Sequence, residues 1–178
     1  MESKRMDARQ PQRKKRQDIV VRALTVDDID AIIEIDANVM GEAKPEYWRR
    51  KLALYLAGQD LQAITTAANE YFVGIDPQLA RVAEVNGRVV GFMIGEIRSW
   101  EFHQPPTGWI TAMGVDAAYQ RQGIGRRLLA EVLDCFREKK LENVCTMVEW
   151  SDGEVLSFFT AMGFDRGSFI ELEKKLSL

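Results

Sequence analysis

Hydrophobic residues follow two spacings along the chain, and the changes between them mark the predicted elements. Residues 19–24 form a short apolar stretch that predicts a strand. A capping-box pattern begins at Thr25, apolar residues then recur at helical spacing, and Gly41 is a natural helix end. Pro45 opens a second predicted helix. Residues 58–78 show no clear period, so the sequence assigns them no element.

The middle of the chain predicts a hairpin followed by another strand. Residues 79–85 and 88–98 are apolar stretches joined by Asn86 and Gly87, a pair that suits the left-handed positions of a type I′ turn. After a proline-containing loop, residues 109–115 predict the next strand. We therefore expect three consecutive antiparallel strands.

The C-terminal part alternates between helix and strand signals. An amphipathic helical stripe starts at Gly123, and 144–148 predicts a strand. Residues 155–162 return to helical spacing before Gly163, a natural C-cap. Residues 169–176 alternate apolar and charged side chains, which predicts a closing strand. The pattern as a whole indicates an α/β protein with a mixed sheet and helices on its faces.

Composition narrows the possible classes of protein. The 178 residues are 46% hydrophobic and 29% charged, and we expect one domain over 19–178. There is neither an apolar run near the roughly 20 residues of a membrane span nor the apolar core of a secretory signal. A cytoplasmic protein is expected, with Cys135 and Cys145 as free thiols. These two cysteines and His103 are too few for a four-ligand zinc site, so we expect no metal.

The net charge of −3 is distributed unevenly. Residues 1–18 contain seven basic and three acidic side chains, a basic arm on an acidic body. Such an arm could contact nucleic acid, but it has no aromatic residue on which bases could stack. The composition favours a flexible, solvated tail over a nucleic-acid contact.

One segment, 115–126, combines features suited to an anion. It connects a predicted strand to a predicted helix, where free backbone N–H groups and the helix dipole converge. Gly123 and Gly125 would let a phosphate approach the backbone, while Arg121 and Arg126 add positive charge. The segment lacks the Lys-Ser/Thr of a Walker loop and the third glycine of the dinucleotide fingerprint. On spacing alone, a plain strand-to-helix turn stays open as an alternative.

Residues 120–125, Gln-Arg-Gln-Gly-Ile-Gly, resemble the Gln/Arg-x-x-Gly-x-Gly/Ala signature of the GNAT acetyltransferase superfamily. Residues 158–164 resemble its late Phe-Tyr-x-x-x-Gly-Phe signature, and the likeness covers roughly 19–176. The resemblance implies the GNAT fold, an α+β arrangement. Its sheet is mixed but mostly antiparallel, has six to seven strands with helices on both faces, and is splayed between the fourth and fifth strands.

The resemblance also implies acetyl-CoA, or another acyl-CoA, as co-substrate. The implied pyrophosphate site consists of the backbone amides of Arg121, Gln122, Gly123, Ile124, Gly125 and Arg126. The pantetheine arm would pair with the backbone of Met113, Gly114 and Val115. Gly114 is either the bulge expected in the fourth strand or a site of close packing. Asp152 stands where many members have an Asn, and it lacks the amide donor.

The implied reaction is direct acyl transfer to a primary amine, either a protein N-terminus or lysine or a small molecule. The sequence looks closest to the ribosomal-protein N-terminal acetyltransferases, in which a Glu acts as base and a Tyr as acid. Met147 and Phe159 occupy those positions here. Glu149 is our candidate base, because in a regular strand it would share a face with Met147. Further candidates are Glu96, Glu101, His103 and Tyr119.

The acceptor site is expected between the first two helices and the loop 99–108. An acidic, aromatic lining there would attract a cationic amine through charge and cation–π contacts. The candidate lining residues are Glu42, Glu46, Trp48, Trp100, Glu101 and Phe102, with ordinary surface and core roles as the alternative. Because Met147 and Phe159 replace the usual pair, a CoA-binding regulatory module with little turnover is the alternative function. A homodimer is compatible with the resemblance.

Overall fold

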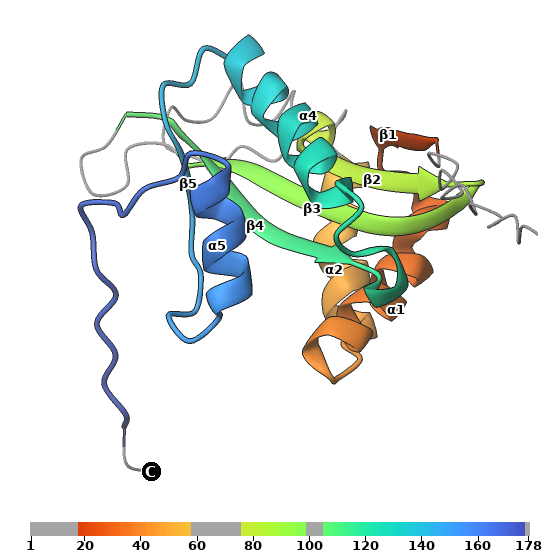
Figure 1. The fold of residues 1–178 in the computed structure, drawn as a ribbon, viewed down its shortest axis with the longest axis horizontal. Helices are drawn as coiled ribbons and strands as arrows, with labels where there is room; N and C mark the ends of the chain where they lie inside the picture. The colour runs from red at the N-terminus through yellow and green to blue at the C-terminus, as the bar shows by residue number, and fades with distance from the viewer. Residues whose placement is uncertain (1–17, 58–75, 99–104, 177–178) are drawn as a thin grey trace, which may run out of the picture.

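A computed structural model describes residues 18–57, 76–98 and 105–176 of the chain. These residues contain a five-stranded sheet in the order β1-β2-β3-β4-β5 (Figure 1). The strands are β1 (Ile19–Ala23), β2 (Ala80–Val85), β3 (Arg88–Arg98), β4 (Thr107–Val115) and β5 (Val144–Thr146). The first four pair antiparallel with their sequence neighbours, and β5 pairs parallel with β4.

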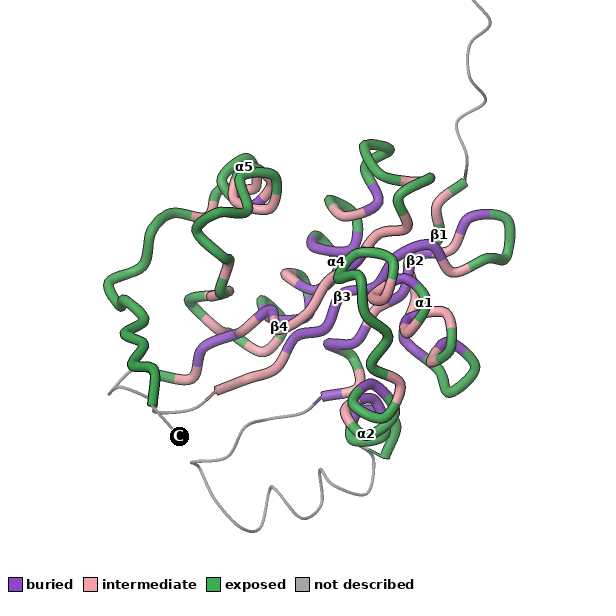
Figure 2. The backbone as a smooth tube through the Cα atoms, turned by 90° about the horizontal axis from the view of Figure 1, so that it is seen from below, coloured by how far each residue is buried: buried purple, intermediate pink, exposed green. Residues whose placement is uncertain are grey.

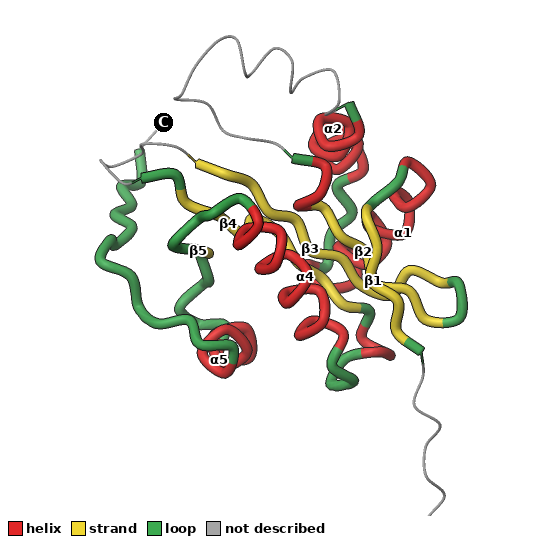
Figure 3. The backbone as a smooth tube through the Cα atoms, turned by 90° about the horizontal axis from the view of Figure 1, so that it is seen from above, coloured by secondary structure: helices red, strands yellow, loops and turns green. Residues whose placement is uncertain are grey.

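Helices cover both faces of this sheet. The α-helices within the described residues are α1 (Ile29–Met40), α2 (Pro45–Leu56), α4 (Ile124–Glu138) and α5 (Gly153–Ala161). Short 3-10 helices span Val26–Asp28, Pro77–Leu79 and Ala117–Tyr119. Figure 3 shows α1 and α2 on one side of the strands and α4 and α5 on the other. The predicted fold class, a mixed and mostly antiparallel sheet between helices, is confirmed.

Each face of the sheet has its own hydrophobic core. Met93 of β3 belongs to the cluster beneath α4, together with Leu128 and Val132. Its neighbour Phe92 belongs to the cluster beneath α1 and α2, together with Leu52. Alternate side chains of one strand therefore serve opposite cores, as strand geometry requires. Figure 2 shows this burial running along the central strands.

Two glycines on neighbouring strands make room for Phe136 of α4. A Cβ atom on Gly108 would lie 2.9 Å from Cδ1 of the Phe136 ring, and one on Gly95 would lie 2.9 Å from its Cζ. The ring is 1% exposed, so it is enclosed on all sides. This contact seats the C-terminal half of α4 against β3 and β4.

The turn predictions are confirmed by backbone conformation. Asn86 and Gly87 join β2 to β3 with φ angles of 53° and 77°, the left-handed pair of a type I′ turn. Gly41 ends α1 with a φ of 78°. In these places the local sequence alone determines the geometry.

Two predicted strands are wrong in extent. The strand predicted over 144–148 ends at Thr146, and residues 169–176, predicted as a closing strand, adopt none. The described sheet consequently has five strands rather than six or seven. Alternation of apolar and charged residues indicates that a segment can form a strand, but a strand also requires a partner backbone. Residues 1–17 of the predicted basic arm and residues 58–75, which the sequence assigned no element, lie outside the described residues.

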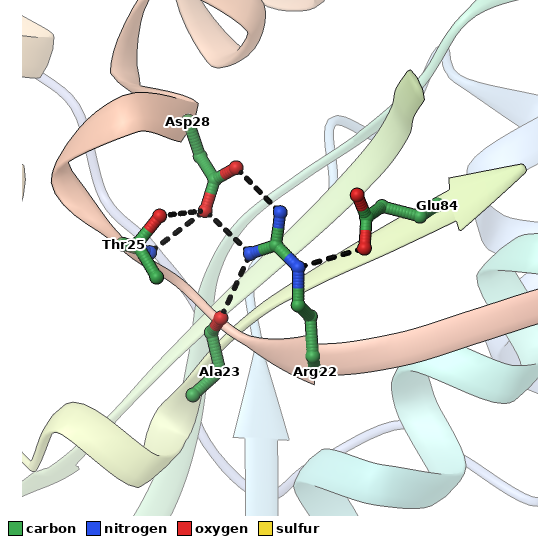
Figure 4. A network of polar contacts seen from close by, with 5 residues as sticks. All are labelled: Arg22, Ala23, Thr25, Asp28 and Glu84. Atoms are coloured by element: carbon green, nitrogen blue, oxygen red, sulfur yellow. Dashed lines mark hydrogen bonds and ion pairs between the residues drawn. The ribbon is translucent and has the colours of Figure 1, made fainter. Parts of the chain in front are cut away.

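A partly buried ionic network connects β1 to the start of α1 (Figure 4). The Asp28 carboxylate, 3% exposed, accepts hydrogen bonds from both Arg22 Nη atoms at 2.7 and 2.8 Å. It also accepts from the Thr25 backbone N–H at 2.7 Å. Arg22 Nε donates to Glu84 Oε2 at 2.8 Å, which adds β2 to the network. Burial alone would raise the pKa of Asp28, but the hydrogen bonds from Arg22 and Thr25 outweigh it and lower the pKa.

This lowered pKa predicts a contribution to acid unfolding. A carboxyl whose pKa is lower in the folded state stabilises the fold above its unfolded pKa, and this stabilisation is lost as pH falls through the folded value. Below about pH 4, wild type should therefore lose stability more steeply than Asp28→Asn. Urea unfolding across a pH series measures this. Asp27→Asn, at the exposed neighbouring carboxylate, should follow wild type, and parallel curves for wild type and Asp28→Asn would contradict the prediction.

The Phe136 contact predicts a cost for any side chain at residue 108. Gly108→Ala should lower the free energy of unfolding by about 1–3 kcal/mol, because the enclosed ring must shift. The control is Gly153→Ala at the start of α5, where a Cβ would meet nothing within 4 Å. Chemical denaturation of both variants compares them. Equal stabilities would show that the ring moves freely.

Candidate functional site

The candidate site lies where β4 and β5 separate. Their pairing runs from Gly108 with Val144 to Ile110 with Thr146. At the last pair, the Thr146 hydroxyl donates to the Ile110 carbonyl at 3.1 Å. Beyond it β4 continues to Val115, and within the described ranges no strand pairs with this part on the β5 side. The predicted separation of the fourth and fifth strands is therefore present.

A bulge in β4 coincides with this separation. In the pairing with β3, Ile94 faces Ala112 and Gly95 faces Ile110, so Thr111 is the extra residue. The bulge predicted for this strand exists, but its assignment to Gly114 is wrong. Gly114 pairs regularly with Phe92, and a Cβ there would lie 2.7 Å from the Phe92 ring. Gly114 thus permits close packing, the alternative that the sequence left open.

Backbone alternation places two of the predicted residues at the open edge. The N–H of Asp116 donates to Val90 of β3 at 2.9 Å, so residue 116 points toward β3. The backbone N–H and C=O groups of Val115 and Met113 consequently point away from β3, into the gap that opens past the end of β5. The Val115 carbonyl accepts from Gln120 Nε2 at 3.1 Å. The N–H groups of Met113 and Val115 thus face the side on which β4 has no paired strand.

The loop after β4 ends at the N-terminus of α4, as predicted. Gly123 has a φ of 85°, and no side chain caps the helix. The first backbone bond within this turn is from the Arg127 N–H to the Gly123 carbonyl, at 3.1 Å. The preceding N–H groups of Ile124, Gly125 and Arg126 therefore lack intrahelical partners. A Cβ on Gly123 would meet nothing within 4 Å, so a side chain at this position would point into open space.

Polar side chains hold the loop in shape. Asp116 Oδ1 accepts from the Ala118 N–H at 2.9 Å, and Gln122 Nε2 donates to the Ala118 carbonyl at 3.1 Å. Arg121 forms an exposed ion pair with Glu154 of α5 at 2.8 Å. Arg126 is exposed. The sequence identified the glycines and arginines but missed the supporting roles of Asp116 and Gln120, whose only signal was their place beside the motif.

The two signature motifs meet in space. A Cβ on Gly125 would lie 3.4 Å from the Phe158 ring of α5 and 3.9 Å from Met113 Cε. The first turn of α4, the middle of α5 and the free part of β4 therefore converge at this point. Sequence reasoning did not place Phe158 in the site, because its contact with Gly125 depends on the tertiary fold.

Three further predicted positions have clear local roles. Asp152 caps α5, with Oδ1 accepting from the Val155 N–H at 3.0 Å. Phe159, 4% exposed, packs edge-on against Phe158 and Phe164 and belongs to the core. Met147 follows β5 and is 64% exposed. Phe159, where the resemblance implied an acid, is thus a ring in the core. Met147, where it implied a base, is an exposed thioether.

The candidate bases occupy different environments. Glu149 is exposed in the loop after β5, and its Oε1 accepts from the Ser151 hydroxyl at 2.6 Å. Glu96 of β3 pairs with Trp109 beside the bulge, and its half-buried carboxylate accepts from Arg98 Nε at 2.6 Å. The other described candidate, Tyr119, packs against the α4 core.

Tyr55 of α2 lies close to Glu96, on the α2 face of the sheet. Its hydroxyl donates to the Gly95 carbonyl at 3.0 Å. Burial, followed by the charge of Glu96, raises the pKa of the Tyr55 phenol well above its ordinary value. The phenol is therefore protonated throughout the neutral range and acts as a fixed hydrogen-bond donor.

The predicted acceptor lining stays a prediction, except that Trp48 is wrong. Trp48 is 2% exposed, and its Nε1 donates to Asp36 at 2.7 Å, so it is a core residue. Glu42 and Glu46 are exposed. The remaining candidates, Trp100, Glu101, Phe102 and His103, lie outside the described residues.

Two hollows lie outside the first turn of α4, and the first of them reaches Asp116 at the start of the loop. One of about 390 Å³ adjoins the Arg22–Asp28 network, and one of about 530 Å³ lies on the outer face of α2. The described part of the chain contains no cluster of three side chains able to hold a metal ion. Every helix in that part is too short or too polar to cross a bilayer. Cys135 is buried, and burial raises the pKa of the half-buried Cys145 thiol.

Comparison with known proteins establishes the family. The model of the acetyltransferase (GNAT) family matches residues 46–164, which include the separated strands, the loop and α5. The chain belongs to this family of acetyltransferases. It is 32% identical over 91 residues to a mycothiol acetyltransferase of Thermomonospora curvata, covering 51% of this chain and 29% of that protein. A mycothiol acetyltransferase of Nocardia farcinica is 34% identical over 77 residues, covering 43% and 25%. The matches therefore span less than a third of either relative.

Solved structures share the fold. Ard1 from Thermoplasma volcanium superposes with a TM-score of 0.64 at 21% identity, covering 84% of each chain. An aminoglycoside N-acetyltransferase in complex with CoA gives a TM-score of 0.69 at 12% identity, covering 93% of this chain and 99% of that one. The NatC complex bound to a Gag peptide and CoA gives 0.63 at 18% identity, with 84% and 86% covered.

Proposed function

We propose that this protein is an N-acetyltransferase that transfers the acetyl group of acetyl-CoA to a primary amine. The observation that carries the proposal is the free edge of β4 ending beside the uncapped N-terminus of α4. An extended amide-bearing chain can pair with such an edge as a strand would. A pyrophosphate suits the N–H groups of the following helix. Membership of the GNAT family and the CoA-bound neighbour support the same ligand.

The residues present fit acetyl-CoA. Gly123 and Gly125 bring no side chain to the loop, and exposed Arg126 adds positive charge beside it. Acetyl-CoA supplies a thioester whose carbonyl carbon accepts the amine nitrogen, so that a C–N bond forms and the C–S bond breaks. The Met113 N–H, at the open edge of β4, would stabilise the negative charge that develops on the carbonyl oxygen.

The amine must lose a proton before or during its attack. We assign Glu149 this role as general base, since it lies in the loop that leaves the separated β5. Glu96 is the competing carboxylate, because it lies on β3 next to the bulge. The departing thiol is acidic enough to leave without a protein acid, which accommodates Phe159 in the core.

A substitution in the loop tests the binding site. Gly123→Glu places a carboxylate where the pyrophosphate should lie, and it should raise the Kd for acetyl-CoA by about 100-fold or more, equivalent to about 2.7 kcal/mol. Gly41→Glu is the matched control: it makes the same change at a similar positive φ outside the loop, where a Cβ likewise meets nothing within 4 Å. Isothermal titration with acetyl-CoA compares them. An unchanged Kd in Gly123→Glu would remove the loop from the site.

The catalytic assignment is tested by kinetics. The amine panel contains peptides, polyamines, aminoglycosides and amino acids, and thiol release from acetyl-CoA reports turnover. Glu149→Gln should lower kcat/KM about 100-fold, as expected for a lost base. The control Glu131→Gln, on the exposed face of α4, should retain activity.

The other outcomes discriminate between hypotheses. If Glu96→Gln rather than Glu149→Gln abolishes transfer, the base is Glu96. If acetyl-CoA binds but no amine is acetylated, the second candidate function is supported: a CoA-binding regulatory module with little turnover. The buried Phe159 and exposed Met147, where the resemblance expected an acid and a base, favour that second function.

A further inference from the structure

The bulge in β4 lies beside a buried tyrosine of α2. The register between β3 and β4 shifts between Ile94 and Gly95, where Thr111 is the extra residue. The Tyr55 hydroxyl donates to the Gly95 carbonyl at 3.0 Å. It is also a hydrogen-bond partner of the Thr111 side chain, which partly offsets the rise in the pKa of Tyr55. One side chain from a helix therefore contacts both strands at the register shift.

The bulge needs such support, because its extra residue interrupts the ladder of backbone hydrogen bonds. The Thr111 hydroxyl reaches the Ile94 carbonyl only at 3.4 Å, which is longer than a normal O–H···O hydrogen bond. Tyr55 makes the shorter contact, and its ring is 3% exposed in the core that also contains Trp48. The hydroxyl is thus held in one position, where losing it would leave a buried carbonyl without this donor.

The bulge determines which backbone groups of β4 face the gap. The Gly108 N–H donates at 3.0 Å to the carbonyl just before β5, whereas the Asp116 N–H donates at 2.9 Å to β3. In an uninterrupted strand every second residue points the same way, so 108 and 116 would point to the same neighbour. The extra residue Thr111 reverses this alternation. It thereby turns the N–H groups of Met113 and Val115 toward the open side.

We propose that Tyr55 is a positioning residue for acetyl-CoA: its hydroxyl holds the Thr111 bulge in place, and the bulge presents the open N–H groups of β4 to the pantetheine arm. The inference rests on the proposed function, since it takes that arm as the ligand of the free edge. Tyr55 belongs to the core and acts through the bulge, not on the reacting atoms. Without the hydroxyl, molecules that have shifted or lost the bulge become more populated. The apparent Kd then rises as the binding-competent fraction falls.

Two ligands distinguish a positioning role from a general loss of stability. Acetyl-CoA should use both the β4 edge and the α4 N-terminus, whereas ADP carries the pyrophosphate without the pantetheine arm. In isothermal titration, Tyr55→Phe should raise the Kd for acetyl-CoA about tenfold and change that for ADP less than about twofold. The control is Tyr47→Phe on the exposed side of α2, where the hydroxyl accepts from Lys51 Nζ at 3.1 Å. It should match wild type with both ligands. An unchanged Kd for acetyl-CoA in Tyr55→Phe, or equal weakening of both ligands, would overturn the proposal.

Hydrogen exchange of the ligand-free protein tests the bulge independently of acetyl-CoA. By the alternation of β4, the Ala112 N–H points toward Ile94, its partner on β3. In Tyr55→Phe this amide should exchange about tenfold faster, beyond any change at Leu128 in the core of α4. Equal acceleration at Ala112 and Leu128 would show a global effect and contradict the role of Tyr55. Failure of wild type to bind acetyl-CoA would instead contradict the proposed function, and exchange at Ala112 would still decide whether Tyr55 holds the bulge.

Discussion

The separation of β4 from β5 is the constraint on which the rest of the candidate site depends. Thr146 satisfies the last paired carbonyl of Ile110 through its side chain, and the Thr111 bulge follows at once on the other side of the strand. The two features together let β4 turn away from its neighbour without leaving that carbonyl unsatisfied. What remains is a length of strand whose hydrogen-bonding groups are available to a ligand.

The two cores hold this open edge rigid. Phe136 fixes α4 over Gly95 and Gly108, so the helix N-terminus stays at the end of β4. On the opposite face, the Phe92 ring packs against Gly114. This contact fixes the position of the unpaired part of β4 relative to the core beneath α1 and α2. A binding edge built on a central strand with covered faces needs little reorganisation when a ligand arrives.

The sequence predicted features governed by local chemistry and missed those that depend on distant contacts. The Asn86-Gly87 turn and the glycine loop at Gly123 were correct, because positive φ angles and helix ends are encoded within a few residues. The sequence offered Gly114 as the bulge, with close packing as the alternative, whereas the bulge is at Thr111, because its position depends on registration with β3. Trp48 looked suited to a ligand, but its place in the core follows from how α2 meets α1. The pattern of apolar and charged residues gave no indication that Phe158 of α5 would meet Gly125 of α4 beside the gap.

The contact between Gly125 and Phe158 links two segments that are far apart along the chain. Because residue 125 has no side chain, the aromatic ring of α5 can approach the first turn of α4 to van der Waals distance. The size of residue 125 therefore determines how closely α4 and α5 approach each other. Among descendants of such a sequence, substitutions at 125 and 158 would be coupled, and their combined volume would vary less than either alone.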